Sequence, residues 1–138
     1  MVMAFLLDTN VLSELRKGLK ADANVRHWAA STLGQRHFVS VLSLGEIRKG
    51  IERLRPKDPL QAAMIERWLD TLRQNFGDHV LPFTDDVADC WGRITAKTPL
   101  AVSDSLIAAT ALTHGLTVAT RNVADFIPCG VPVLNPFG

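Results

Sequence analysis

The sequence predicts an α/β domain with a central, mainly parallel β-sheet and helices on both faces. Short apolar segments of strand length alternate along the chain with longer segments whose apolar residues recur at helical spacing. The chain has 138 residues, 47% hydrophobic and 21% charged, which is enough for one ordinary core. No internal repeat, linker or low-complexity segment divides it. We therefore expect a single domain over 1–138.

In the first half of the chain, the apolar segment MAFLL (3–7) predicts a buried strand, and a helix is expected over 10–17. Apolar residues at helical spacing predict a second helix over 22–32. The β-branched segment HFVSV (37–41) predicts the next strand, and a third helix is expected over 43–54.

In the second half, Pro56 and Pro59 interrupt the chain, and an amphipathic helix follows that Gly77 ends. A later helix is apolar or small on nearly every side, so we expect it to be buried. The predicted elements here are helices over 60–76, 85–96 and 103–115, and strands over 80–83, 116–120 and 131–134.

Two serines are predicted to cap helices. Ser43 is followed three residues later by Glu46, which is a capping-box pattern. Ser103 stands just before Asp104 at the start of the buried helix, and it is the expected N-cap there.

Composition excludes several classes of protein. No apolar stretch reaches the roughly 20 residues that span a bilayer, and no secretory signal is visible, so a cytoplasmic protein without membrane attachment is expected. The distant Cys90 and Cys129 and four single histidines predict neither a disulfide framework nor a zinc site. The net charge of +1 gives no general attraction to nucleic acid, although basic residues cluster over 16–20 and 48–57.

Acidic residues occupy conspicuous places in this pattern. Asp8 follows the apolar end of the first strand, and ligands of parallel sheets bind beyond the carboxyl ends of the strands. Asp8 either ends the strand or is presented to a ligand. Glu46 lies at the edge of the buried stripe of its helix, and Arg53 lies within about 20° of it at 100° per residue.

Asp104 and Asp125 each have two interpretations as well. Asp104 opens the buried helix, where Asp is also favoured by the helix dipole. Asp125 follows the strand LTVAT and is either a turn acid or part of a site to which Thr120 and Asn122 add oxygen atoms.

If these acids converge, their mutual repulsion needs a cation. With no His or Cys well placed, the site would be all-oxygen and would suit Mg²⁺ or Mn²⁺. Such a site suits hydrolysis of phosphate esters, because a metal ion activates water and a second ion stabilises the leaving oxygen.

Four segments carry a resemblance to a known family: FLLDTNVLSEL, SVLSLGEIRKGIERL, SDSLIAATALTHGLTVATRNVADF and GVPVLNPFG. In this order they resemble PIN-domain proteins, and within them the VapC toxins of type II toxin–antitoxin modules, in the FitB-like branch. The resemblance implies a Mg²⁺- or Mn²⁺-dependent endoribonuclease that hydrolyses RNA with metal-activated water. It also implies a cognate antitoxin and a homodimer or a higher toxin–antitoxin assembly.

By this resemblance, Asp8, Glu46, Asp104 and Asp125 are the catalytic and metal-binding acids. Relatives often have an acid near the stretch TRNVADF, sometimes at the position that Asn122 occupies here, so Asp125 is the candidate for the fourth acid and the fourth position is either Asn122 or Asp125. The remaining expected contacts of the RNA substrate are Thr9, Asn10, Lys49, Arg53, Thr120, Arg121 and Asn122.

The alternative function is a non-catalytic PIN-like module for RNA binding or assembly. Such a module would keep the hydrophobic pattern and lose acids, whereas at least three acids are in place here. Trp68 on the 60–76 helix is expected either at a dimer or antitoxin interface or packed on the core.

Overall fold

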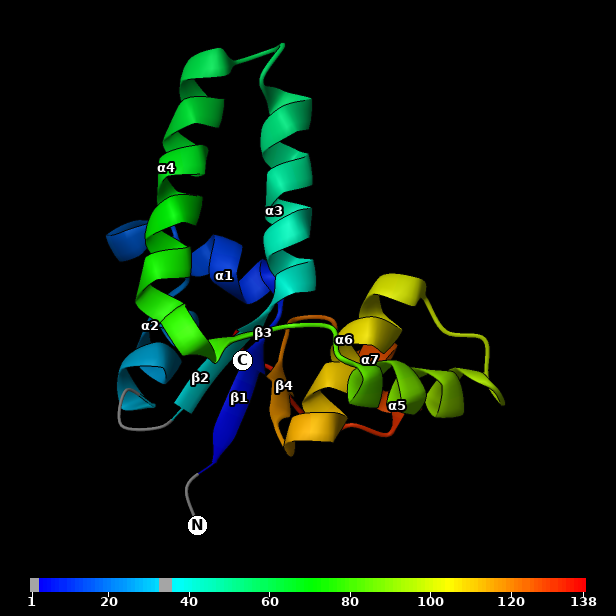
Figure 1. Ribbon diagram of the computed structural model, residues 1–138. Coiled ribbons are helices and arrows are strands. Elements are labelled where there is room, and N and C mark those ends of the chain that lie inside the picture. Colours follow the sequence, from blue (N-terminus) through cyan, green and yellow to red (C-terminus); the bar gives the residue numbers. More distant parts are fainter. Residues whose placement is uncertain (1–2, 33–35) are drawn as a thin grey trace.

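The computed structural model describes residues 3–32 and 36–138, in which five parallel strands form one sheet in the order β3-β2-β1-β4-β5 (Figure 1). Every strand pair is parallel, as the alternating pattern predicted. The strands are β1 (Ala4–Leu7), β2 (Arg36–Ser40), β3 (Val80–Leu81), β4 (Thr117–Ala119) and β5 (Val133–Leu134).

Helices cover both faces of this sheet, with α1 to α4 on one side and α5 to α7 on the other (Figure 1). The helices α3 and α4 form a long antiparallel pair that extends away from the sheet. The helices are α1 (Thr9–Leu15), α2 (Ala23–Ser31), α3 (Val41–Leu54), α4 (Pro59–Phe76), α5 (Asp85–Thr95), α6 (Val102–His114) and α7 (Val123–Phe126), with 3₁₀ turns at Gly18–Lys20, Gly77–His79 and Ile127–Cys129.

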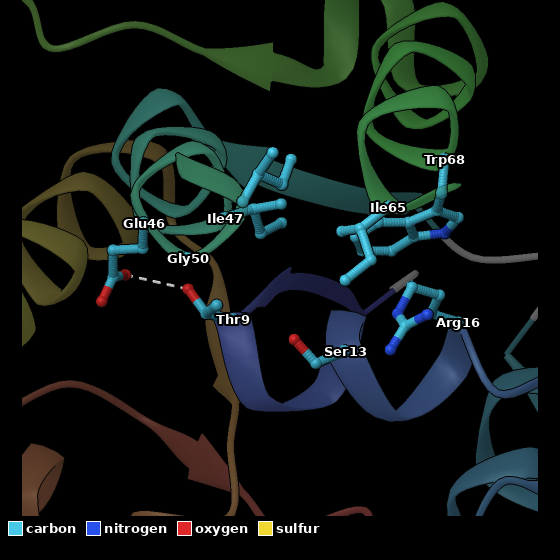
Figure 2. Close-up of a pocket in the computed structure, with 9 residues that line it drawn as sticks. Thr9, Ser13, Arg16, Glu46, Ile47, Gly50, Ile65 and Trp68 are labelled. Atoms are coloured by element: carbon cyan, nitrogen blue, oxygen red, sulfur yellow. Dashed lines mark hydrogen bonds between the residues drawn. The ribbon is translucent and has the colours of Figure 1, made fainter. Parts of the chain in front are cut away.

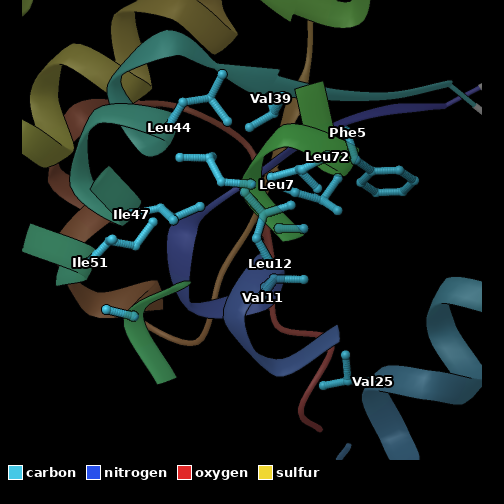
Figure 3. Close-up of a cluster of buried hydrophobic side chains, with 13 residues drawn as sticks. Phe5, Leu7, Val11, Leu12, Val25, Val39, Leu44, Ile47, Ile51 and Leu72 are labelled. Atoms are coloured by element: carbon cyan, nitrogen blue, oxygen red, sulfur yellow. The ribbon is translucent and has the colours of Figure 1, made fainter. Parts of the chain in front are cut away.

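Strand β1 is buried on both sides, which explains its uninterrupted apolar sequence. Phe5 and Leu7 point into the core under α1 to α4, which Figure 3 shows. Leu6 points the opposite way, into the core under α6 and α7. This alternation follows from the period of two in a strand.

The order in which the chain adds strands to the sheet reverses beside β1. From β1 the chain continues through β2 to β3 on one side, and it then returns to β4 on the other side. The backbone N–H of Asp8 donates to the carbonyl of Ala119 at 3.0 Å, so the ends of β1 and β4 are joined at this reversal. Ligands of open parallel sheets bind at such a point.

Several predicted boundaries were wrong. Ser43 does not cap α3, because β2 ends at Ser40 and the Ser40 hydroxyl accepts from the N–H of Leu42. The helix therefore begins at Val41, and Ser43 is buried within it. Helix α6 also begins earlier than predicted, with Ala101 at the N-cap and no side-chain cap.

Two further differences concern short elements. The predicted strand over 80–83 has only two residues, since Pro82 has no N–H to donate to a neighbouring strand. The short helix α7 lies where the sequence suggested only a turn around Asp125. Within the described ranges, no helix combines the length and the apolar character that a bilayer crossing requires.

Replacing Leu69 by alanine should lower the free energy of unfolding by about 2–5 kcal/mol, because Leu69 on α4 is fully buried in the core. Met64 on the same helix is 56% exposed, and Met64→Ala is the matched control, expected within about 0.5 kcal/mol of the parent. Urea unfolding followed by circular dichroism measures both. Equal destabilisation by the two variants would contradict this packing of α4.

Candidate functional site

Asp8 is the buried centre of the candidate site. It is the N-cap of α1, directly after β1, and only 5% of its surface is exposed. Its Oδ1 accepts from the backbone N–H of Thr9 at 2.8 Å, and its Oδ2 accepts from the Thr120 hydroxyl at 2.8 Å. No salt bridge in the described part of the chain involves Asp8. Asp8 is thus a buried acid with hydrogen bonds and no paired base.

Thr120 and Asn10 fix the orientation of this carboxylate. The buried Thr120 hydroxyl donates to Asp8 and accepts from the Asn10 amide at 3.2 Å and from the N–H of Asn122 at 3.0 Å. The Asn10 side-chain NH2 also donates to Asp8 Oδ2 at 3.3 Å, and the side-chain Oδ1 of Asn10 accepts from the backbone N–H of Arg121. With one hydrogen bond donated and two accepted, the Thr120 hydroxyl has no hydrogen-bonding capacity left. The start of α1 and the end of β4 therefore hold Asp8 in one geometry.

Glu46 approaches from α3. It is exposed, and its Oε1 accepts from the Thr9 hydroxyl at 2.8 Å, as Figure 2 shows. Thr9 is adjacent to Asp8 in the chain, so this bond brings the second predicted acid beside the first. Glu46 could not serve as the partner of a Ser43 cap, because its carboxylate is turned toward α1 instead.

Asp104 and Asp125 come from the opposite face of the sheet. Asp104 lies in the first turn of α6 and is half-buried, and Asp125 lies on the short helix α7 and is exposed. Cys129 is close by, with its Sγ 3.8 Å from the carbonyl of Asp125. The four acids thus come from four separate elements, and they lie near enough for the charges of Glu46 and Asp125 to influence Asp8 and for all three to influence Asp104.

The electrostatics of these acids reflect their convergence. Burial raises the pKa of the Asp8 carboxyl, hydrogen bonds from Thr120 and Thr9 partly offset this, and the charges of Glu46 and Asp125 raise it further. Burial also raises the pKa of Asp104, and the charges of Asp8, Asp125 and Glu46 act in the same direction. Within the described part of the chain, the charges that shift these two pKa values are all negative.

The donor atoms suit a hard divalent cation. The oxygen atoms at the site belong to carboxylates and hydroxyls, which are ligands that such cations prefer. Burial raises the pKa of the nearby Cys129 thiol, and the charge of Asp104 raises it further, so this sulfur stays protonated. Among the described residues, no three acidic, His or Cys side chains lie close enough as they stand to hold a metal ion together. Mg²⁺ is commonly held by one or two carboxylates and waters, so the donor set fits this ion without a complete protein cage.

The predicted basic contacts lie outside the Asp8 network. Lys49 and Arg53 are exposed on α3 and form no salt bridge in the described part of the chain. Arg121 contributes only its backbone N–H to Asn10, and its guanidinium lies 3.8 Å from the centroid of the Phe137 ring. Asn122 contributes its N–H to Thr120. Whether these residues contact RNA stays a prediction.

The sequence analysis missed one part of the surroundings. Thr9 and Glu46 also line a pocket that continues between α1, α3 and α4 to Arg16 and Trp68. The spacing of Thr9, Ser13 and Arg16 would have indicated one shared helix face. The aromatic partner on α4 is 52 positions beyond Arg16, and no sequence pattern connects them.

Comparisons with known proteins agree with this architecture. Residues 5–126 match the family model of the PIN domain. The chain is 36% identical over 142 residues to the toxin FitB of Neisseria gonorrhoeae, with 96% of this chain and 97% of FitB covered. It is 29% identical over 137 residues to the VapC ribonuclease Y4jK of Sinorhizobium fredii, with 96% of each protein covered.

A solved structure has the same fold. The crystal structure of FitAcB from Neisseria gonorrhoeae matches with a TM-score of 0.85 and 32% sequence identity. The match covers 96% of this chain and 98% of the other chain, so the likeness extends over the sheet and the helices on both of its faces.

Proposed function

This chain belongs to the PIN-domain family, and from that membership we propose that it is the ribonuclease toxin of a type II toxin–antitoxin module. In this proposal it is an endoribonuclease that hydrolyses RNA phosphodiester bonds with Mg²⁺ or Mn²⁺ as its cofactor. The names of two relatives, a VapC ribonuclease and a toxin, support the activity and the biological role.

The observation that carries the proposal is the state of Asp8. A carboxylate that is 95% buried and forms no salt bridge with any described residue costs several kcal/mol to keep ionised, and the fold retains it where the strand order reverses. Its three hydrogen-bond donors fix its direction and leave its charge unpaired. A bound cation is the component that would balance this charge.

In the proposed mechanism, Asp8 and Asp104 would hold the cation, and Glu46 and Asp125 would complete its surroundings through water. When bound, Mg²⁺ or Mn²⁺ supplies Lewis acidity, which lowers the pKa of water and neutralises charge on the phosphate. Thr120 and Asn10 keep Asp8 in place during the reaction, and Thr9 does so for Glu46. This is catalysis through positioning and electrostatic stabilisation.

RNA contacts are assigned by position. The exposed Lys49 and Arg53 lie on the same helix as Glu46, and they would bind phosphates in a sequence-independent and salt-sensitive way. Thr9, Asn122 and Arg121 border the acids and would orient the strand. A cognate antitoxin is the proposed partner, and assembly into a homodimer stays a prediction from the family resemblance.

The direct test is cleavage of single-stranded RNA by the purified chain. We expect cutting with Mg²⁺ or Mn²⁺, none with EDTA, and products with a 5′-phosphate that a 5′-phosphate-dependent exonuclease degrades. The matched control is Lys97→Gln, which removes a charge from the loop between α5 and α6 and should cut as the parent does.

Two results would contradict the proposal in different ways. RNA binding without cutting in any metal would indicate a non-catalytic module. Undiminished cutting in EDTA would remove the metal ion from the mechanism and leave the ribonuclease assignment intact.

A further inference from the structure

The pocket next to the acids has an elongated lining with two chemically different ends. It has a volume of about 250 Å³ and lies between α1, α3 and α4. Glu46 and Thr9 form one end, and Arg16 and Trp68 form the other, with Ser13 and Ile65 between them (Figure 2). Because it shares Glu46 and Thr9 with the candidate site, it is a continuation of that site.

The length of this pocket can be estimated from the residues of α1 and its C-cap Arg16 that line it. Thr9, Ser13 and Arg16 lie four and then three positions apart, so they face the same side of the helix. At 1.5 Å per residue, Thr9 and Arg16 are about 10 Å apart along the helix axis. The lining along α1 is therefore about 10 Å long, and the volume of about 250 Å³ is large enough for one ring-sized group.

The far end combines an aromatic face with a cation. The Trp68 ring is half-buried against the core, and the guanidinium carbon of Arg16 lies over this ring, 6.0 Å from its centroid. Arg16 is exposed and forms no salt bridge among the described residues. A flat aromatic side chain next to a cation is the combination that binds a stacked base and its phosphate.

The charges around the pocket favour an anionic strand. The neighbouring bases Lys17, Arg48 and Arg55 are already paired with glutamates. Several described bases form no salt bridge, and among them Arg16 stands at the far end while the exposed Lys49 and Arg53 lie on α3 with Glu46. These three cations are available to successive phosphates of one strand, and Ile47 and Ile51 supply the apolar floor beneath a base.

We propose that this pocket binds one base of the RNA substrate, next to the phosphate that is cut, with Trp68 as its stacking partner and Arg16 as the contact of the adjoining phosphate. The proposal rests on the proposed ribonuclease function. It assigns to this pocket the positioning of the RNA strand relative to the acids. A base held at the Trp68 end would place its neighbouring phosphate toward Glu46 and Asp8.

The test uses the full-length chain and RNA substrates in which one base at a time is absent. For the parent, loss of the base at one position beside the cut should lower kcat/KM about tenfold. For Trp68→Leu, intact RNA should already be cut about tenfold less efficiently, and loss of that base should have less than about a twofold further effect. Trp68→Phe retains a stacking ring and should recover most of the efficiency.

Two controls separate binding from stability. Phe76→Leu removes a half-buried ring from the same helix outside the pocket, and it should leave the effect of the missing base as in the parent. Arg16→Gln should weaken RNA binding in EDTA and reduce the slope of log affinity against log salt by about 0.7, as for one lost phosphate contact. The midpoint of thermal unfolding is measured for every variant.

The outcomes are distinguishable. If the parent cuts no RNA, the proposed function is overturned and this inference with it. If the parent cuts RNA and a missing base has equal effects in the parent and in Trp68→Leu, only the base pocket is overturned. Weaker binding of the cognate antitoxin by Trp68→Leu and Arg16→Gln, with unchanged cleavage of RNA, would identify a protein-docking pocket and also overturn the assignment to RNA.

Discussion

Asp8→Asn is expected to reduce RNA cleavage at least about a thousandfold, because it removes the buried charge on which cation binding depends and several kcal/mol of charge stabilisation with it. Asparagine keeps an oxygen that can accept from the N–H of Thr9, so the start of α1 remains capped. Asp104→Asn is expected to have a comparable effect. Initial rates at saturating Mg²⁺ measure the loss.

Asp58→Asn is the matched control for this substitution. Asp58 is likewise an N-cap, at the start of α4, and its side chain accepts from the N–H of Gln61. Asparagine is an equally good cap, so this variant should fold and cut RNA as the parent does. Undiminished cutting by both Asp8→Asn and Asp104→Asn would show that the catalytic site lies elsewhere.

Mg²⁺ is expected to raise the midpoint of thermal unfolding, because it binds the folded cluster of acids and not the unfolded chain. At ten times the dissociation constant the ion contributes about 1.4 kcal/mol. This corresponds to a rise of roughly 3–6 °C in a domain of this size. Asp8→Asn should lose most of the rise, whereas Asp58→Asn should retain it.

The pH dependence without Mg²⁺ gives a second expectation for the same cluster. The pKa values of Asp8 and Asp104 in the folded protein are above their ordinary value of 3.8. Between that value and the folded pKa, the folded state binds more protons, so stability falls as the pH rises through this window. Asparagine does not titrate, so the stability of Asp8→Asn relative to the parent should be highest at neutral pH and should fall as the pH falls through this window to about 3.8.

Two results together would contradict the metal site. The parent would be equally stable with and without Mg²⁺, and the stability of Asp8→Asn would change with pH in the same way as that of the parent. Scanning calorimetry of the four combinations of variant and metal provides the measurement. Exposed ion pairs such as Arg55 with Glu52 affect both proteins alike and cancel in the difference.

The alternation of apolar strands and amphipathic helices determined the class of fold. A parallel sheet covered on both faces needs apolar residues on both sides of a central strand, and the segment 5–7 has them. The same logic placed Asp8 at the carboxyl end of β1 and Asp104 at the start of a buried helix. Helix starts were less well determined, since both Ser40 and Ser43 can cap, and only the end of the pairing between β2 and its neighbours decides between them.

The connections within the site were decided by tertiary structure alone. Thr120 and Asp8 are 112 positions apart, and Thr9 and Glu46 are 37 apart. They meet because β4 pairs with β1 and because α3 packs beside α1. Local sequence encodes which residues end a strand or begin a helix, whereas hydrogen bonds between distant side chains depend on which strand ends become neighbours. The sequence by itself therefore determined which acids are present and at which edge of the sheet they lie. The order of the strands and the packing of the helices determined which side chains form hydrogen bonds and which acids influence one another's charge.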